Sequence, residues 1–307
     1  MPAYNIPIME KETFSLWQSM LEKKTGMWLP ETRTAFLVTS LSRHMREIGL
    51  SDYQEYYQML DRGLISSLEW AKLVDSLTVH ETCFYRDKDS LKLVVNYCRN
   101  KIQSDLRTNP STRSNLQIWS VGCSTGEETY TLALELEKLK ANIKESGGSD
   151  VYYGVTGIDV SYPSLAVARD GIYTEKHRDF IPDATVNHYF DRLADGHIQV
   201  NKNIRQRTCF IQSNILEIDS DFDQLFDVIY CQNVMIYFRA DKKETVIKKL
   251  INRLAPGGLL VLGHGEITST QSKELTRVDN KQCLAFVKKA SIVNRSNQIT
   301  GITSEFA

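Results

Sequence analysis

The most informative polar residues lie in and after a short glycine-rich turn. The run Gly122-Cys123-Ser124-Thr125-Gly126 follows a strand-like segment and precedes a helix that opens with Glu127 and Glu128. Glycine at Gly122 lets the backbone approach a ligand closely at the carboxyl end of a strand, where open α/β sheets bind cofactors. Two acids at a helix start favour a positively charged ligand, such as the ammonium and sulfonium of S-adenosylmethionine. The alternative is an ordinary strand-to-helix turn whose glutamates only complement the helix dipole.

The same turn argues against two other classes of ligand. A phosphate-binding loop has the pattern GxxxxGK[ST], and a dinucleotide site has GxGxxG without carboxylates beside the pyrophosphate. Neither pattern occurs here. A nicotinamide-dependent oxidoreductase is therefore a distant alternative.

Further polar residues follow predicted strands at what should be the same edge of a sheet. Asp159 ends one strand-like run, and Asn214 and Asn233 follow the next two. An acid at the position of Asp159 can accept hydrogen bonds from a pair of ribose hydroxyls. Each of these residues, taken alone, also fits an ordinary loop. Their coincidence with Gly122 at one edge favours a single site.

The segment HETCFYRD (80–87) lies between a helical region and a sheet region, and sites often form at such junctions. Arg86 and Asp87 also fit an ordinary surface ion pair, which contributes little to stability. No metal site is expected.

Hydrophobic spacing predicts helices up to about residue 95 and alternating strands and helices beyond it. Strands that alternate with helices indicate an α/β fold with a parallel sheet covered on both faces. An exposed loop is expected at 100–115, because Ser, Thr, Asn and Pro are frequent there. The expected divisions are a helical N-terminal domain with its connector (1–95), a sheet domain (96–290), an inserted small β-subdomain (171–206) and a flexible tail (291–307).

Composition excludes several classes of protein. The 37 basic and 38 acidic residues give a formal net charge of -1, so no nucleic-acid partner is expected. The six cysteines form no CxxC pair, the first residues do not resemble a secretory signal, and no apolar run approaches the ~18 residues that span a bilayer. We expect a cytoplasmic enzyme without direct membrane insertion.

Four blocks in order resemble the CheR-type chemotaxis protein-glutamate O-methyltransferases: HETCFYRD, IWSVGCSTGEETYTLAL, FDVIYCQNVMIYF and LAPGGLLVLGHGE. The resemblance implies a Rossmann-like, class I S-adenosylmethionine-dependent methyltransferase domain behind an all-α N-terminal domain. The implied reaction transfers the methyl group to the side-chain carboxylate of a chemoreceptor glutamate and releases S-adenosylhomocysteine. The branch of this family that serves type IV pilus systems (PilK-like) is one hypothesis for this chain.

The resemblance also assigns roles to residues. Glu128 would hold the methionine end of the cofactor, and Asp159 its ribose. Arg86 and Tyr237 are the expected catalytic residues: Arg86 would orient a carboxylate of the substrate or of the cofactor, and Tyr237 would wall the path of the methyl group. The other expected cofactor contacts are His80, Thr82, Gly122, Asn214, Ile215, Gln232 and Asn233.

The sequence departs from the family pattern in several places. Gln232 stands where many members have Arg, Thr129 replaces a frequent Pro, and His80 occupies a position that can be Asn. The segment 191–201 lacks the GxG turn of members that dock on a receptor's C-terminal pentapeptide. Docking through such a tether is therefore not expected.

Partner binding is expected through the helical domain. Arg33, Arg43 and Arg46 suit the acidic helical surface around receptor methylation sites, and the alternative is a solvated polar face.

Two functional alternatives stay open. A nucleic-acid amino-methyltransferase would have Pro-Pro directly after the strand-end asparagine, where this chain has Asn233-Val234-Met235. A non-catalytic scaffold would keep the fold without needing Glu127, Glu128 and Asp159.

Overall fold

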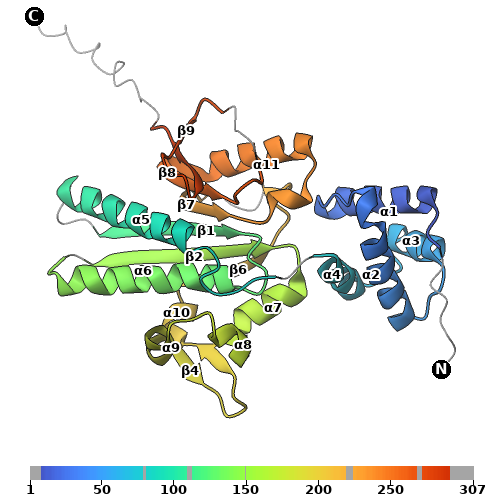
Figure 1. The fold of residues 1–307 in the computed structure, drawn as a ribbon, viewed down its shortest axis with the longest axis horizontal. Helices are drawn as coiled ribbons and strands as arrows, with labels where there is room; N and C mark the ends of the chain where they lie inside the picture. Colours follow the sequence, from blue (N-terminus) through green and yellow to red (C-terminus); the bar gives the residue numbers. More distant parts are fainter. Residues whose placement is uncertain are drawn as a thin grey trace, which may run out of the picture.

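The computed structural model describes residues 8–78, 81–108, 113–148, 150–218, 224–267 and 272–290. His80 and the expected tail at 291–307 lie outside the described residues. Figure 1 shows a group of helices at one end of the molecule and a sheet flanked by helices at the other. The expected combination of an all-α domain and an α/β domain is confirmed.

The N-terminal domain forms because its apolar residues recur at helical spacing. Its elements are α1 (Lys11–Thr25), η1 (Glu31–Arg33), α2 (Thr34–Glu47), α3 (Tyr53–Asp61) and α4 (Ser67–Leu77). Trp17, Leu37 and Leu41 are fully buried in one shared core. Helix α4 begins at a capping serine, since the Glu69 N–H donates to Ser66 Oγ at 3.1 Å.

The second domain contains a seven-stranded sheet in the described part of the chain, in the order β6-β2-β1-β7-β8-β10-β9. Its strands are β1 (Ser114–Val121), β2 (Val151–Asp159), β6 (Thr208–Gln212), β7 (Phe226–Cys231), β8 (Leu254–Leu262), β9 (Leu275–Arg277) and β10 (Leu284–Lys288). The neighbours from β6 to β8 pair in parallel, whereas β10 is antiparallel to both β8 and β9.

Helices cover both faces of this sheet, as predicted. The helices are α5 (Lys88–Thr108), α6 (Glu127–Glu145), α7 (Tyr162–Asp170) and α11 (Ala240–Arg253). Ile118 pairs with Val228 and shares a core with α5 and α6. The next pair along the strands, Trp119 and Ile229, shares the opposite core with α11. The alternation of side chains along each strand thus creates two separate cores.

The inserted β-subdomain is also confirmed. It consists of β3 (Ile172–Tyr173), α8 (Glu175–Arg178), α9 (Asp183–Tyr189), β4 (Phe190–Arg192), β5 (Ile198–Val200) and α10 (Lys202–Arg205). Its three strands pair antiparallel in the order β3-β5-β4. Tyr173 and Phe190 pack edge-on against Phe84, with ring centroids 4.9 and 5.7 Å away. The subdomain is therefore anchored beside the segment that links the two domains.

The expectation of an exposed loop at 100–115 is wrong. Helix α5 continues to Thr108, and β1 already begins at Ser114. Cys98 and Ile102 are fully buried against the sheet, because they extend the apolar period set by Leu91 and Val94. The boundary expected at 95/96 falls inside this helix.

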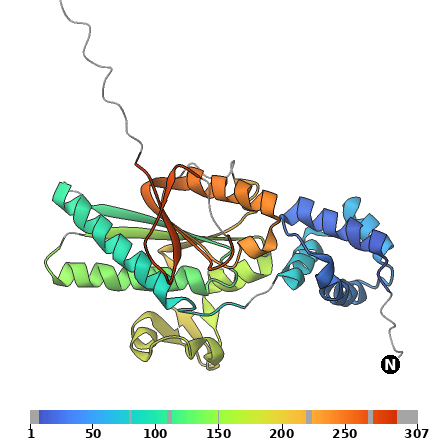
Figure 2. The ribbon, with the colours of Figure 1, turned by 45° about the horizontal axis from the view of Figure 1, so that its top comes forward.

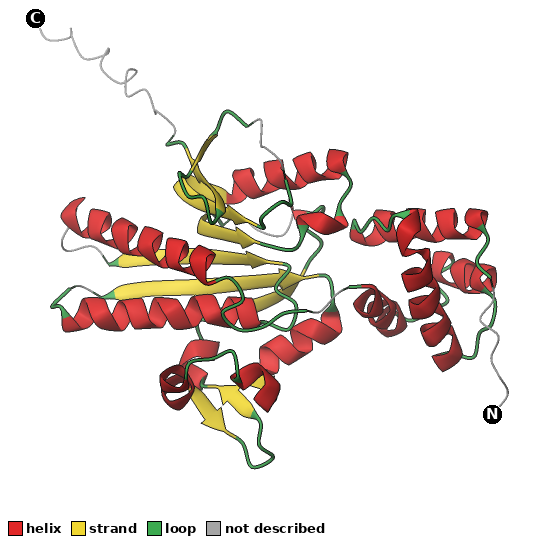
Figure 3. Cartoon of the chain, viewed as in Figure 1, coloured by secondary structure: helices red, strands yellow, loops and turns green. Residues whose placement is uncertain are grey.

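The N-terminal domain lies beyond the carboxyl ends of the parallel strands, to which the strand arrows point (Figures 1, 2 and 3). This is the edge at which open α/β sheets bind ligands. Among the described residues, no helix combines the length and the apolar character needed to cross a bilayer.

Candidate active site

A pocket opens at the carboxyl edge of the sheet, and the glycine-rich turn between β1 and α6 forms its floor. Gly122 has a φ of 73°, and a Cβ atom there would lie 2.4 Å from Cγ2 of Val234. The N–H groups of Gly122 and Cys123 both donate to the Ile158 carbonyl, at 2.8 and 2.9 Å. The turn is thus tied to the end of β2, and its first position requires glycine.

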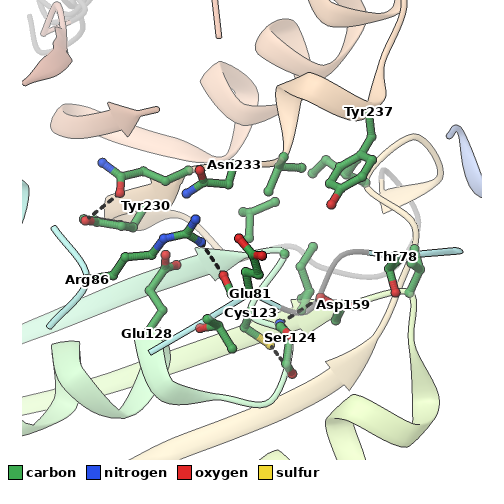
Figure 4. Close-up of a pocket in the computed structure, with 18 of the residues that line it drawn as sticks. Thr78, Glu81, Arg86, Cys123, Ser124, Glu128, Asp159, Tyr230, Asn233 and Tyr237 are labelled. Atoms are coloured by element: carbon green, nitrogen blue, oxygen red, sulfur yellow. Dashed lines mark hydrogen bonds between the residues drawn. The ribbon is translucent and has the colours of Figure 1, made fainter. Parts of the chain in front are cut away.

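Asp159 ends β2 beside this turn, as predicted. Its Oδ2 accepts the Ser124 N–H at 2.8 Å, and its Oδ1 accepts the Ser161 N–H at 2.8 Å. Figure 4 shows Asp159 next to Ser124 in the pocket. Two backbone donors therefore orient the carboxylate before any ligand binds.

The two glutamates at the start of α6 face different surroundings. Glu127 is fully buried and does not line the pocket. Its carboxylate accepts a hydrogen bond from Thr125 Oγ1 at 2.7 Å and lies 3.4 Å from Nε2 of His177 in the inserted subdomain. The Thr125 carbonyl also accepts the Tyr173 hydroxyl at 2.8 Å. The interpretation of paired acids facing a ligand is therefore wrong for Glu127, which instead joins the turn to the subdomain.

Glu128 does line the pocket. Its Oε1 accepts a hydrogen bond from Ser120 Oγ at 2.7 Å. Removal from water raises the pKa of Glu128 to about 8, although the hydrogen bond from Ser120 and the positive charge of Arg86 act in the opposite direction. A cationic ligand beside this carboxyl would stabilise its ionised form.

Arg86 and Thr82, both expected cofactor contacts, line the pocket. Arg86 is exposed, and its Nη1 donates to the Glu81 carbonyl at 2.6 Å. Figure 4 shows Arg86 and Glu128 together at one end of the pocket and Asp159 toward the other. The pocket therefore has Arg86 and a carboxyl group at one end and the carboxylate of Asp159 toward the other.

Gln232 lines the pocket but is already engaged within the protein. Its Nε2 donates to Asp87 Oδ2 at 2.8 Å and to Ser90 Oγ at 3.0 Å, and its Oε1 accepts the Tyr230 hydroxyl at 3.0 Å. Burial would raise the pKa of Asp87, but hydrogen bonds from Ser90 and Gln232 hold it below its ordinary value. Ser90 and Gln232 together thus favour the ionised form of this carboxylate at the start of α5.

The remaining predicted contacts also reach the pocket. Asn214 follows β6, and its Oδ1 accepts the Leu216 N–H at 3.0 Å. Ile215 is buried and contributes an apolar surface. Asn233 follows β7 with a φ of 59°, a backbone conformation that asparagine tolerates better than most residues. Apart from Glu127, the structure thus brings together at this pocket every predicted catalytic residue and cofactor contact that it describes.

The N-terminal domain supplies one wall of the pocket. Thr25, Met27 and Thr78 line it together with Tyr237. The Trp28 N–H donates to the Tyr237 carbonyl at 2.8 Å, which ties the two domains together. Tyr237 also packs against the core of the helical domain. The pocket is therefore shared between both domains.

Sequence reasoning missed several of these lining residues. Asp87 carries a local signal, because it caps α5 by accepting the Ser90 N–H at 3.1 Å. Thr25, Met27 and Thr78 carry no such signal, since they reach the pocket only through the docking of one domain on the other.

The predicted docking residues Arg33, Arg43 and Arg46 are exposed on η1 and α2 and do not line the pocket. Helix α4 contacts both α2 and α7. Arg43 and Arg46 are therefore carried by a helix on the far side of α4 from the sheet domain (Figure 1).

The described residues fit S-adenosylmethionine. Asp159 suits the ribose hydroxyls, and Arg86 with Glu128 suits the carboxylate and ammonium of the methionine part. Ile158, Ile215 and Phe238 give the pocket an apolar surface, which suits an aromatic ring such as adenine.

Comparison with known proteins agrees with this assignment. Residues 80–283 match the family model "CheR methyltransferase, SAM binding domain", and residues 12–78 match "CheR methyltransferase, all-alpha domain". The chain is 30% identical over 259 residues to chemotaxis protein methyltransferase 2 of Pseudomonas aeruginosa, covering 83% of this chain and 86% of that protein. It is 26% identical over 260 residues to the chemotaxis protein methyltransferase of Salmonella typhimurium, covering 84% of each chain. The protein therefore belongs to the CheR methyltransferase family and uses S-adenosylmethionine as its cofactor.

Proposed function

We propose that this protein methylates the side-chain carboxylate of glutamate residues in the cytoplasmic helical domain of a chemoreceptor. Relatives named chemotaxis protein methyltransferases, aligned over most of their length, support this assignment. The substrate would reach the pocket at the junction of the two domains.

The observation that carries the proposal is the chemistry of the pocket lining. Within the described residues, the lining contains no histidine or lysine. Of the four carboxylates in the lining, Asp87, Glu128 and Asp159 already accept hydrogen bonds from the protein, and Glu81 is exposed to solvent. An amine or hydroxyl acceptor would need a base to remove its proton. A glutamate with an ordinary pKa of ~4.3 is already ionised at neutral pH and needs none.

The residues around the pocket would then act by positioning and by excluding water. When bound, S-adenosylmethionine supplies a methyl group on a positively charged sulfur, which a carboxylate oxygen can accept directly. Asp159 and Glu128 would hold the two ends of the cofactor. Arg86 would align a carboxylate, and Tyr237 would close the side that faces the helical domain. Alignment and exclusion of water accelerate a transfer in which opposite charges are neutralised.

The test is methylation of a purified chemoreceptor cytoplasmic fragment with methyl-labelled S-adenosylmethionine. We expect label on the receptor that mild alkali releases as methanol, because esters hydrolyse and N-methyl groups do not. A matched receptor with glutamine at the candidate glutamates should stay unlabelled. Label that resists alkali would contradict carboxyl methylation.

A non-catalytic scaffold is the alternative. Its signature would be binding of S-adenosylhomocysteine by calorimetry together with binding of the receptor, but no labelled product. The variant Asp159→Ala serves as a control, since it should lose cofactor binding while keeping receptor binding.

A further inference from the structure

The short loop from β2 to α7 directly follows Asp159, the acid assigned to the ribose, and contacts the N-terminal domain. It consists of Val160 and Ser161, which follow Asp159, the last residue of β2. Val160 packs against the apolar core of the helical domain and also lines the pocket. The loop thus faces the cofactor site on one side and the other domain on the other.

A buried polar contact crosses the domain boundary at this loop. The Ser161 hydroxyl donates a short hydrogen bond to Oδ1 of Asp75, near the end of α4. The Ser164 hydroxyl donates to the same oxygen at 3.1 Å. Ser161 is fully buried and Ser164 almost so. One carboxylate of the helical domain therefore accepts both hydroxyls from the first turn of α7.

Ser161 also links this contact to the cofactor site through a hydrogen bond to Asp159. The same Ser161 donates its backbone N–H to Asp159 Oδ1 at 2.8 Å, and Asp159 Oδ2 accepts the Ser124 N–H of the glycine-rich turn. On the other side, the Asp75 carbonyl accepts the Thr78 hydroxyl at 2.9 Å, and Thr78 lines the pocket. Asp75 is thus joined to the pocket by its side chain and by its backbone.

We propose that Asp75 is a positioning residue for cofactor binding: it fixes Ser161, and through Ser161 the carboxylate of Asp159, so that the helical domain sets the affinity for S-adenosylmethionine. The inference concerns cofactor binding alone. It does not depend on the identity of the methyl acceptor, so its failure and that of the proposed function are distinguishable.

A merely structural tie between the domains predicts something different. It would lower stability when broken but leave the affinity of the folded protein for the cofactor unchanged. If the hydrogen bond between Ser161 and Asp75 acts through Asp159, breaking it should instead change the affinity for the cofactor. Substitutions of Ser161 and of Asp75 should then have non-additive effects on that affinity.

The experiment is a double-mutant cycle on the full chain, with S-adenosylhomocysteine affinity measured by calorimetry. Asp75→Ala and Ser161→Ala should each weaken binding by about tenfold, and the double variant by little more than either single variant. Binding of 5′-methylthioadenosine, which keeps the ribose but lacks the amino-acid end, should weaken by the same factor.

Two further variants separate positioning from general loosening. Asp75→Asn keeps an oxygen acceptor for Ser161 and should retain most of the affinity. Arg239→Ala breaks a different contact across the same boundary, where the guanidinium stacks 4.8 Å from the Trp28 ring and lies 3.8 Å from Glu22. It should leave affinity unchanged.

Three results would overturn the proposal. The first is a folded Asp75→Ala variant with unchanged affinity, and the second is an additive double variant. The third is an equal loss of affinity in Arg239→Ala. If Asp75→Ala does not fold, Ser161→Ala serves instead, because it leaves the Asp75 carboxylate in place. An unchanged affinity for S-adenosylhomocysteine in that variant would then overturn the proposal.

Discussion

At the scale of single residues, the pocket is held in place largely by backbone hydrogen bonds. Asp159 accepts one N–H group from the glycine-rich turn and one from the residues that follow it, and Asn214 accepts one from its own loop. Glu128 and Gln232 are likewise fixed by neighbouring side chains. Polar groups that are ordered in advance reduce the loss of conformational freedom on binding. Substitutions of the supporting partners should therefore affect affinity as well as stability.

Glu128 should make cofactor affinity depend on pH. Its pKa is raised to about 8, so the carboxyl is largely protonated at neutral pH in the free protein. An ammonium favours the ionised form, so S-adenosylhomocysteine should bind more tightly as the pH rises toward 8, by up to about tenfold per unit. Calorimetry across this range measures the effect. Glu128→Gln should remove the dependence, and an equally steep profile in that variant would contradict the assignment.

The same carboxyl should lower stability as the pH rises. Its pKa is higher in the folded than in the unfolded chain, so the unfolded chain ionises first. The free energy of unfolding should therefore fall from the ordinary carboxyl range up to about pH 8, and no further beyond it. Urea unfolding of the cofactor-free protein at several pH values, compared with Glu128→Gln, isolates this contribution.

Gly122→Ala should impair folding and cofactor binding together. The left-handed backbone costs a non-glycine residue about 1–2 kcal/mol, and the added Cβ would lie 2.4 Å from Val234 Cγ2. Thermal unfolding and calorimetry measure the two effects. Combining Gly122→Ala with Val234→Ala should recover the part due to the collision. If it recovers nothing, backbone conformation alone is responsible.

At the scale of elements, α5 joins the two halves of the architecture. It begins beside the pocket at Asp87 and ends against the sheet core. Ile102 is fully buried near its end. Ile102→Ala should therefore destabilise the protein by about 2–5 kcal/mol in urea unfolding. The neighbouring exposed Gln103 provides the control: Gln103→Ala should change little, and equal effects would argue against packing of this turn.

The same helix shows how far local patterns predict the structure. The parallel strands and the edge shared by Gly122 and Asp159 follow from apolar runs and their spacing along the chain, whereas the short strand β9 has no such signal. The end of α5 was also missed, because polar composition at 100–115 was given more weight than the apolar period that continues to Ile102. The end of α5 is stabilised by burial against the sheet, and a short stretch of sequence around residues 100–115 gives no information about that tertiary contact.

At the scale of the whole molecule, the pocket exists only where the two domains meet. Trp28 and Tyr237 are joined across this boundary although they lie far apart in the sequence. Nothing in the local pattern around Thr25 or Thr78 predicts that these residues line a cofactor site. Their role depends on tertiary docking, and for this reason the wall from the helical domain was not foreseen.

Receptor recognition should be separable from cofactor binding at this scale. Arg43 and Arg46 are exposed on α2, away from the pocket lining. The double variant Arg43→Glu and Arg46→Glu should lower methylation of an acidic receptor helix, most strongly at low salt, because charge complementarity mainly affects association. Calorimetry should give an unchanged affinity for S-adenosylhomocysteine. Equal loss of both would instead indicate misfolding.

The inserted subdomain has a consequence for any attempt to redesign this protein. Its Tyr173 hydroxyl holds the Thr125 carbonyl, and its His177 lies against the buried Glu127. The subdomain therefore contacts the glycine-rich turn and the start of α6, and it supports the turn on the side away from the pocket. A graft that exchanges 171–206 for the corresponding segment of a relative must carry partners for both contacts, or it will disturb methyl-donor binding at a distance from the exchanged segment.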